Sequence, residues 1–132
     1  MKQFLFESKP FRQYRGWDGA LGTGLGTALG FAQQYGTPLL IVVCDNRGYV
    51  SQTWNVHKYF ADGAAVRSGQ FFGDVLTPTP DYVKLAEAYG GTGERVESTA
   101  ALESAIDRAL AALAAGRSAL LDVFLAGGKW QG

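Results

Sequence analysis

The chain has 132 residues, enough for one domain with a substantial hydrophobic core, and 47% of them are hydrophobic. Twelve Lys and Arg residues balance twelve Asp and Glu residues, which removes the electrostatic argument for DNA, RNA or an anionic membrane as the main partner. Its apolar runs, such as 39–44, are far shorter than the roughly 20 residues of a membrane span. The first residues contain no secretory hydrophobic region, and the single cysteine cannot form an internal disulfide, so we expect a cytoplasmic protein.

The amino-terminal part predicts one helix after an irregular start. Residues 1–18 have no clear period, and we interpret them as a linker or edge segment. Residues 23–35 favour a helix despite their glycines, because three apolar side chains share one face: Leu25, Leu29 and Ala32. The sequence Gly-Thr-Pro at 36–38 is typical of a helix end.

The run Leu-Leu-Ile-Val-Val-Cys at 39–44 predicts a strand. It is rich in β-branched residues and has no polar alternation, which indicates a strand covered on both faces, as in a parallel sheet. Cys44 lies inside this run and is therefore expected to be a buried, inert thiol. Residues 45–49 are expected to form the turn at its carboxyl end.

The middle of the chain predicts a long loop and then a helix. Residues 50–78 look irregular and aromatic, and a loop of this length is usually a lid or an interface. The next segment is a well-marked helix, with Thr79 as its cap, Pro80 at its first position and Gly90 at its end.

The last third alternates strand, helix and strand over 93–98, 98–116 and 119–126. The expected stripe of this second helix is Leu102, Ile106, Leu110 and Leu113. Strands and helices that alternate through short links imply an α/β fold with a doubly wound parallel sheet. We expect this domain to span 19–126, with a short tail at 127–132.

The turn after the first strand is a candidate ligand site, because ligands of open parallel sheets bind at the carboxyl ends of strands. Asp45, Asn46 and the backbone around Gly48 offer hard oxygen donors, which suit Mg²⁺ or Ca²⁺ better than zinc. The alternative is a plain turn, since Asp, Asn and Gly dominate turns.

The glycine-rich run at 19–30 contains five glycines and has two further interpretations. Its backbone N–H groups suit a phosphate near a helix start, and Gly24, Gly26 and Gly30 with Asp45 resemble a dinucleotide fingerprint of an NAD(P)-dependent oxidoreductase. That fingerprint requires a strand immediately before the glycines, which this sequence lacks. The remaining alternative is helix packing through small residues.

Taken together, these segments resemble the carboxyl-terminal cofactor-binding domain of thiamine-diphosphate-dependent enzymes, nearest to the acetolactate synthase and benzaldehyde lyase group. The resemblance rests on "GALGTGLGTALG", "FAQQYGTPLLIVVCDNRGY", "TPDYVKLAEAYGG" and the closing "LESAIDRALAALAAGRSALLDVFL". It implies a domain that binds thiamine diphosphate and Mg²⁺ within a 2-keto-acid decarboxylase or carboligase. It also implies a 2-keto acid or aldehyde substrate and a homo-oligomer or a partner pyrimidine-binding domain.

The resemblance also assigns roles. The Gly19 carbonyl would accept from the exocyclic amine of the cofactor, and Leu21 would contact the pyrimidine by its N–H and bend the cofactor with its side chain. The Asn46 amide oxygen and the Gly48 carbonyl would bind Mg²⁺. The implied cofactor-binding residues are Gly19, Ala20, Leu21, Gly22, Asn46, Gly48 and Tyr49.

The chain departs from the family pattern, because it contains no Gly-Asp-Gly, the motif that supplies a metal-binding Asp and holds the diphosphate. We interpret this as the loss of one strand–helix unit of about thirty residues. Asp18 is a rival metal ligand, since its spacing to Asn46 is close to that of the family. The partner domain that supplies the activating glutamate is absent too, so we expect a fragment, a split subunit or a truncated product without catalysis of its own. A remnant that only folds or oligomerises is a further alternative.

Overall fold

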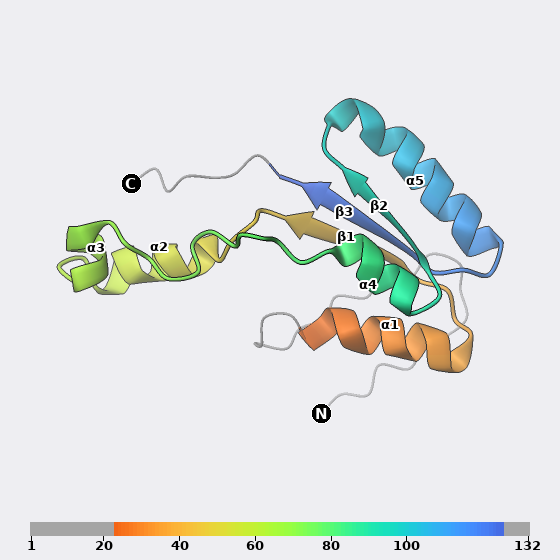
Figure 1. The fold of residues 1–132 in the computed structure, drawn as a ribbon, viewed down its shortest axis with the longest axis horizontal. Helices are drawn as coiled ribbons and strands as arrows, with labels where there is room; N and C mark the ends of the chain where they lie inside the picture. The colour runs from red at the N-terminus through yellow and green to blue at the C-terminus, as the bar shows by residue number, and fades with distance from the viewer. Residues whose placement is uncertain (1–22, 126–132) are drawn as a thin grey trace.

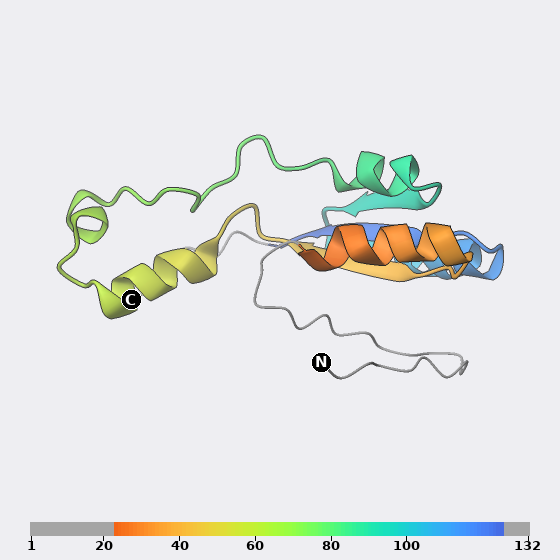
Figure 2. The ribbon, with the colours of Figure 1, turned by 90° about the horizontal axis from the view of Figure 1, so that it is seen from below.

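A computed structural model describes residues 23–125, which form an α/β unit with a projecting arm (Figures 1 and 2). The elements in chain order are α1 (Thr23–Tyr35), β1 (Leu40–Asp45), α2 (Val50–Tyr59), α3 (Ala64–Ser68), α4 (Tyr82–Ala88), β2 (Thr92–Val96), α5 (Thr99–Ala114) and β3 (Ala119–Phe124). The predicted site residues Asp18, Gly19, Ala20, Leu21 and Gly22 lie outside the described residues. No helix in the described part of the chain is long and apolar enough to cross a membrane.

The three described strands form one parallel sheet in the order β1-β3-β2. β3 lies in the centre, where Leu121 pairs with Val42 on one side and with Glu94 on the other. The last strand of the sequence is thus inserted between the first two, which requires crossover connections between parallel neighbours. This arrangement confirms the predicted doubly wound α/β class, in a shortened form.

One face of the sheet packs on α5 and holds the main core. Its buried members are Val96, Ala105, Ala109, Ala119 and Leu121. The two alanines of α5 face the sheet at i and i+4, which lets the helix approach β2 and β3 closely. Burying a side chain such as Leu121 stabilises the fold by about 1.5–3 kcal/mol. The predicted helix stripe is therefore only partly right, because Leu110 is 43% exposed and alanines take the closest positions.

The opposite face packs on α4, which contacts β2 and β3 and lies over β2 in Figure 2. Gly93 in β2 makes this contact possible, because a Cβ atom there would stand 2.6 Å from the Cα atom of Val83. The same face of the sheet carries Arg95, Asp122 and Asp45, since residues two apart on a strand share a face.

β1 is an edge strand in the described structure, and α1 lies beside this edge at the level of the sheet (Figures 1 and 2). α1 buries Leu29 and Ala32, which confirms its predicted apolar face. The prediction that β1 is covered on both faces is wrong: Val42 is 51% exposed, and Cys44 is exposed rather than buried. The physical reason is that α5 packs mainly on β2 and β3, so no helix of residues 23–125 covers the outer part of this face of β1.

Residues 50–78 are not one irregular loop as predicted, because they contain α2 and α3. We call residues 49–76 the arm. Figures 1 and 2 show its two helices extending beyond the carboxyl ends of the strands, away from the sheet. Neither helix contains a buried residue. A helix that faces no core needs no apolar stripe along one side, and such a stripe is the pattern by which helices are predicted from a sequence.

The start of α4 also differs from the prediction. Asp81, not Thr79, is the N-cap, and its carboxylate accepts a hydrogen bond of 3.0 Å from the Lys84 backbone N–H. The Asp81 carboxylate also forms an ion pair with the Lys84 ammonium at 3.0 Å. These hydrogen bonds lower the pKa of Asp81.

Candidate functional site

The loop after β1 is built from two consecutive side-chain turns. Asp45 Oδ1 accepts a hydrogen bond of 2.7 Å from the Arg47 N–H, and Asn46 Oδ1 accepts one of 3.2 Å from the Gly48 N–H. Arg47 has a positive φ of 59°, a conformation that non-glycine residues rarely adopt. Residues 45–48 therefore form the turn that was predicted, and the side chains of Asp45 and Asn46 stabilise its backbone.

The base of the arm holds this loop from the other side. The Tyr49 N–H donates to the Gly73 carbonyl at 3.0 Å, and the Leu76 N–H donates to the Arg47 carbonyl at 2.8 Å. Between these two bonds, a Cβ atom at Gly48 would stand 1.8 Å from the Asp74 carbonyl oxygen. Only glycine fits this approach of two backbones, so the position of residue 48 is fixed by the arm.

Asn46 and Gly48 therefore lie in one turn, at the carboxyl end of β1. No hydrogen bond formed within residues 23–125 ends on the Gly48 carbonyl oxygen. The Asn46 amide oxygen accepts one hydrogen bond and retains a second lone pair. An amide oxygen and a carbonyl oxygen are donors that suit Mg²⁺, with water and substrate phosphates completing its shell. These two residues fit the predicted metal in donor type.

Carboxylates do not complete this donor set within the described structure. Residues 23–125 contain no group of three or more His, Cys, Asp or Glu side chains placed to hold a metal ion. The donors found are two neutral oxygens, so the remaining ligands of a bound Mg²⁺ would have to come from the diphosphate, water or residues outside this range. Asp18, the predicted alternative ligand, lies outside the described residues.

Two buried carboxylates lie beneath the loop, on the face of the sheet that α4 covers. Asp122 is completely buried and Asp45 is 7% exposed, and each has one oxygen without a hydrogen-bond partner, Oδ1 of Asp122 and Oδ2 of Asp45. Arg95 binds the other oxygen of Asp122, with its Nε 3.0 Å from Oδ2. Burial raises the pKa of Asp122, although Arg95 opposes this shift. The sheet therefore holds a strongly desolvated acid close to the strand ends.

Aromatic and cationic groups surround these acids. Burial raises the pKa of the Tyr82 phenol, and the charges of Asp45 and Asp122 add to the shift. The guanidinium of Arg95 lies 4.6 Å from the centroid of the Phe124 ring, and that of Arg47 lies 5.5 Å from it. The cations thus stack on an aromatic ring at the end of β3.

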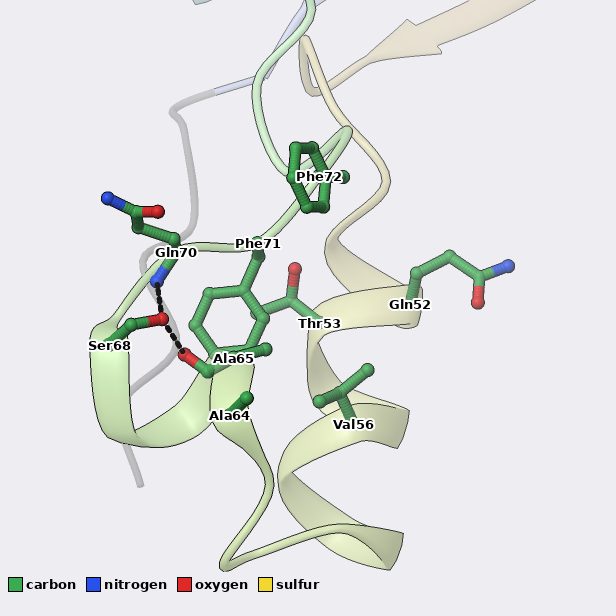
Figure 3. Close-up of a pocket in the computed structure, with 9 residues that line it drawn as sticks. All are labelled: Gln52, Thr53, Val56, Ala64, Ala65, Ser68, Gln70, Phe71 and Phe72. Atoms are coloured by element: carbon green, nitrogen blue, oxygen red, sulfur yellow. Dashed lines mark hydrogen bonds between the residues drawn. The ribbon is translucent and has the colours of Figure 1, made fainter.

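A separate hollow lies in the arm between α2 and α3, with a volume of about 590 Å³. Figure 3 shows its lining, in which the Ser68 hydroxyl accepts from the Gln70 N–H and donates to the Ala65 carbonyl. The lining residues are Gln52, Thr53, Val56, Ala64, Ala65, Ser68, Gln70, Phe71 and Phe72. None of these side chains has a group that titrates near neutral pH. The hollow therefore offers no general acid, no general base and no activated nucleophile.

Comparison with known proteins identifies the family of the chain. The family described as "Thiamine pyrophosphate enzyme, C-terminal TPP binding domain" matches residues 16–123. The chain belongs to this family. Thiamine pyrophosphate is thiamine diphosphate, so the resemblance seen in the sequence is confirmed, and the cofactor class with it.

A relative of this thiamine pyrophosphate domain is the acetolactate synthase isozyme 3 large subunit of Escherichia coli (strain K12). The two are 34% identical over 103 residues, which cover 76% of this chain and 16% of the relative. The chain thus spans about a sixth of the length of that relative. No solved structure matches the chain.

Sequence reasoning missed two features of this thiamine pyrophosphate domain. The first is the contact of Gly48 with Asp74, which no local pattern encodes because the two residues come from different segments. The second is the buried pair of Asp45 and Asp122. A single Asp within the apolar run "ALLDVF" was the signal for Asp122, because a charge there lies at a central strand position that is normally apolar.

Proposed function

We propose that this domain binds thiamine diphosphate together with Mg²⁺, and that the loop after β1 is the metal side of the site. The observation that carries the proposal is the placement of the Asn46 and Gly48 oxygens in one turn, within a chain that belongs to the family. The diphosphate is a concentrated negative charge, and a cation that bridges it to neutral protein oxygens lowers the cost of binding it.

The other end of the cofactor would be held by the glycine-rich segment before α1. The resemblance assigns the pyrimidine contacts to Gly19 and Leu21, and Ala20 and Gly22 complete this segment. Tyr49 would contact the cofactor from the start of α2, where its N–H is already fixed by Gly73. Asp18 is the proposed source of a metal-binding carboxylate if no other segment supplies one. Together these residues would form one cofactor site, with the pyrimidine held by residues 19–22 and the metal held by the loop after β1.

When bound, thiamine diphosphate supplies an electron sink for breaking or forming a bond beside a carbonyl group. The residues of this chain would bind and orient it: Asn46 and Gly48 through the metal, and Leu21 through the shape of its side chain. The substrate class that fits this chemistry is a 2-keto acid or an aldehyde.

We propose that reaction only for an assembly larger than this chain. The chain spans about a sixth of its acetolactate synthase relative, and it lacks the Gly-Asp-Gly segment. The activating glutamate would come from a pyrimidine-binding domain of a partner or of another copy. The chain by itself is then a cofactor-binding unit, while the complete assembly is a lyase or transferase.

Isothermal titration calorimetry tests this proposal directly. Thiamine diphosphate is titrated into the chain in the presence of Mg²⁺ and, separately, in the presence of EDTA. Binding is expected with Mg²⁺ and is expected to weaken strongly in EDTA. Asn46→Ala should weaken Mg²⁺-dependent binding about tenfold or more, because it removes an oxygen ligand. The matched control is Asn55→Ala, on the exposed surface of α2, which should bind like the wild type.

The competing proposals give different results in the same experiment. A nucleotide-binding oxidoreductase would bind NAD⁺ without any need for Mg²⁺, and the family match does not favour it. A remnant that only folds or oligomerises would bind neither ligand. Mg²⁺-dependent binding that Asn46→Ala leaves unchanged would reject Asn46 as the ligand and would move the metal to other residues.

A further inference from the structure

Arg47 carries a guanidinium group that has no acidic partner in the described part of the chain. The side chain is exposed, and within residues 23–125 its guanidinium forms neither an ion pair nor a hydrogen bond. It lies over the Phe124 ring, 5.5 Å from the centroid. Arg95 lies over the same ring but is paired with Asp122, with 3.0 Å between Nε and Oδ2. Arg47 therefore brings an unpaired positive charge to the loop after β1.

The acids closest to this loop are buried beneath it and do not pair with the Arg47 guanidinium. Asp45 accepts the Arg47 backbone N–H at 2.7 Å with one oxygen, and its other oxygen is buried without a hydrogen-bond partner. Asp122 is completely buried and binds Arg95. The guanidinium is therefore open to an anion that arrives from solvent.

Phe124 holds this guanidinium at the edge of the sheet where ligands of parallel sheets bind. Phe124 is the last residue of β3, so its ring lies at the carboxyl end of the central strand. A guanidinium that lies over an aromatic ring keeps the N–H groups along its edge free, and these form paired hydrogen bonds to phosphate or carboxylate oxygens. The contact also restricts the side chain before a ligand binds, which lowers the entropic cost of binding.

Arg47 lies between the two residues that would bind Mg²⁺, Asn46 and Gly48. Its backbone is held at a φ of 59°, and its carbonyl accepts a hydrogen bond of 2.8 Å from the Leu76 N–H. α2 begins three residues later at Val50, and because its first turn contains no acidic residue, its dipole adds to the positive potential. The loop thus offers two neutral oxygens to a cation and one guanidinium to the anion that accompanies the cation.

Charge indicates which anion this is. Near neutral pH, the terminal phosphate of a diphosphate ester carries roughly −1.5 to −2, and the inner phosphate adds about −1. Mg²⁺ bound by neutral oxygens cancels about two of these charges, and one guanidinium balances the charge that remains. The chain lacks the Gly-Asp-Gly motif that would hold the diphosphate, and the resemblance gives no role to residue 47. We propose that Arg47 binds the terminal phosphate of thiamine diphosphate through its guanidinium, an inference that rests on the proposed function.

Isothermal titration calorimetry with thiamine diphosphate and with inorganic pyrophosphate, each with Mg²⁺, tests this inference. Arg47→Gln removes the charge but keeps a polar side chain, and it is expected to weaken the binding of both ligands about tenfold or more. Arg47→Lys, which keeps the charge without the fork of donors, should bind with intermediate affinity. The matched control is Arg117→Gln, which removes an exposed arginine before the amino end of β3 and should bind both ligands like the wild type.

Phosphorus NMR at saturating thiamine diphosphate separates a direct contact from a change in the shape of the loop. The resonance of the terminal phosphate is expected to differ between the wild type and Arg47→Gln, and to be the same in the wild type and Arg117→Gln. Urea denaturation without ligand shows whether each variant is folded, and Arg47→Lys replaces Arg47→Gln in the comparison if the latter is not.

The outcomes separate this inference from the proposed function. If Arg47→Gln binds both ligands like the wild type while Asn46→Ala binds them weakly, the inference is wrong and the proposed function stands. An unchanged terminal phosphate resonance at saturation would also overturn the inference. Pyrophosphate binding that depends on Arg47, beside thiamine diphosphate binding that does not, would place the guanidinium outside the cofactor site. A wild type that binds neither ligand would overturn the proposed function and this inference together.

Discussion

Gly48 and Asp74 are in direct backbone contact, since a Cβ atom at residue 48 would stand 1.8 Å from the Asp74 carbonyl oxygen. This contact ties the loop that offers the Asn46 and Gly48 oxygens to the base of the arm. Two backbone hydrogen bonds, from Tyr49 to Gly73 and from Leu76 to Arg47, flank it. The geometry of the candidate metal site therefore depends on a segment more than twenty residues further along the chain.

Gly48→Ala is expected to lower the free energy of unfolding by about 1–3 kcal/mol, because the new methyl group forces the two backbones apart. Urea denaturation measures this change. Gly30→Ala is the control: no atom lies within 4 Å of a Cβ there, and alanine in the middle of α1 should raise the stability by about 0.5–1 kcal/mol. Equal effects of the two substitutions would show that residues 48 and 74 are not in tight contact.

Asp122→Asn is expected to change how stability depends on pH. Burial raises the pKa of Asp122 in the folded state, so the folded chain binds this proton more tightly than the unfolded chain does. The stability contributed by this group therefore increases as the pH falls through the folded pKa toward the ordinary value. The wild type should gain stability relative to Asp122→Asn as the pH is lowered from neutral toward the ordinary pKa of Asp, about 3.9, as urea denaturation at several pH values would show.

Glu94→Gln provides a control of opposite sign. Its hydrogen bond and ion pair with Arg108 lower the pKa of Glu94. The stability that Glu94 contributes is present above the unfolded pKa and is lost as the pH falls through the folded pKa. The wild type should therefore lose stability relative to Glu94→Gln as the pH falls below about 4.3, the ordinary pKa of Glu. Parallel pH profiles for the two variants would contradict the assigned shifts.

Asp81→Ala is expected to reduce the free energy of unfolding by about 0.5–2 kcal/mol, because it removes the N-cap of α4. Thr79→Ala should cost much less, although the sequence favoured Thr79 as the cap. Thermal or urea denaturation of the two variants decides between the positions. A larger loss for Thr79→Ala would place the start of the helix two residues earlier.

The thiol of Cys44 is expected to react with a disulfide reagent such as Ellman's reagent in the folded protein, because the side chain is exposed at the edge strand. The rate should lie within about tenfold of the rate in denaturant, since little opening is required. Protection by several hundredfold would show that another surface covers this face of β1, as the sequence had suggested.

The sequence predicted the periodic parts of the fold well. The bounds of α1, 23–35, match the structure, and all three described strands were found within a few residues. These elements bury one face or pair with neighbours, so their hydrophobic periodicity reflects their surroundings. The turn that contains Asn46 and Gly48 was also predicted, because turn residues directly after an apolar strand are a local signal.

The parts that the sequence could not predict depend on what surrounds an element. The arm helices bury nothing, so no apolar stripe marked them. Cys44 and Val42 belong to a run that is typical of a covered strand, and only the strand order places them at an edge. The run itself is the kind that a longer sheet would cover, which agrees with the shortened form of the family fold.

The most direct test of the central claim is thermal unfolding of the chain with thiamine diphosphate and Mg²⁺. At a cofactor concentration 100 times its dissociation constant, the folded state should gain about 2.7 kcal/mol of stability, which raises the melting temperature. The gain should disappear with EDTA and be greatly reduced in Asn46→Ala. An unchanged melting temperature at millimolar cofactor with Mg²⁺ would contradict the claim that this chain holds a working thiamine diphosphate site.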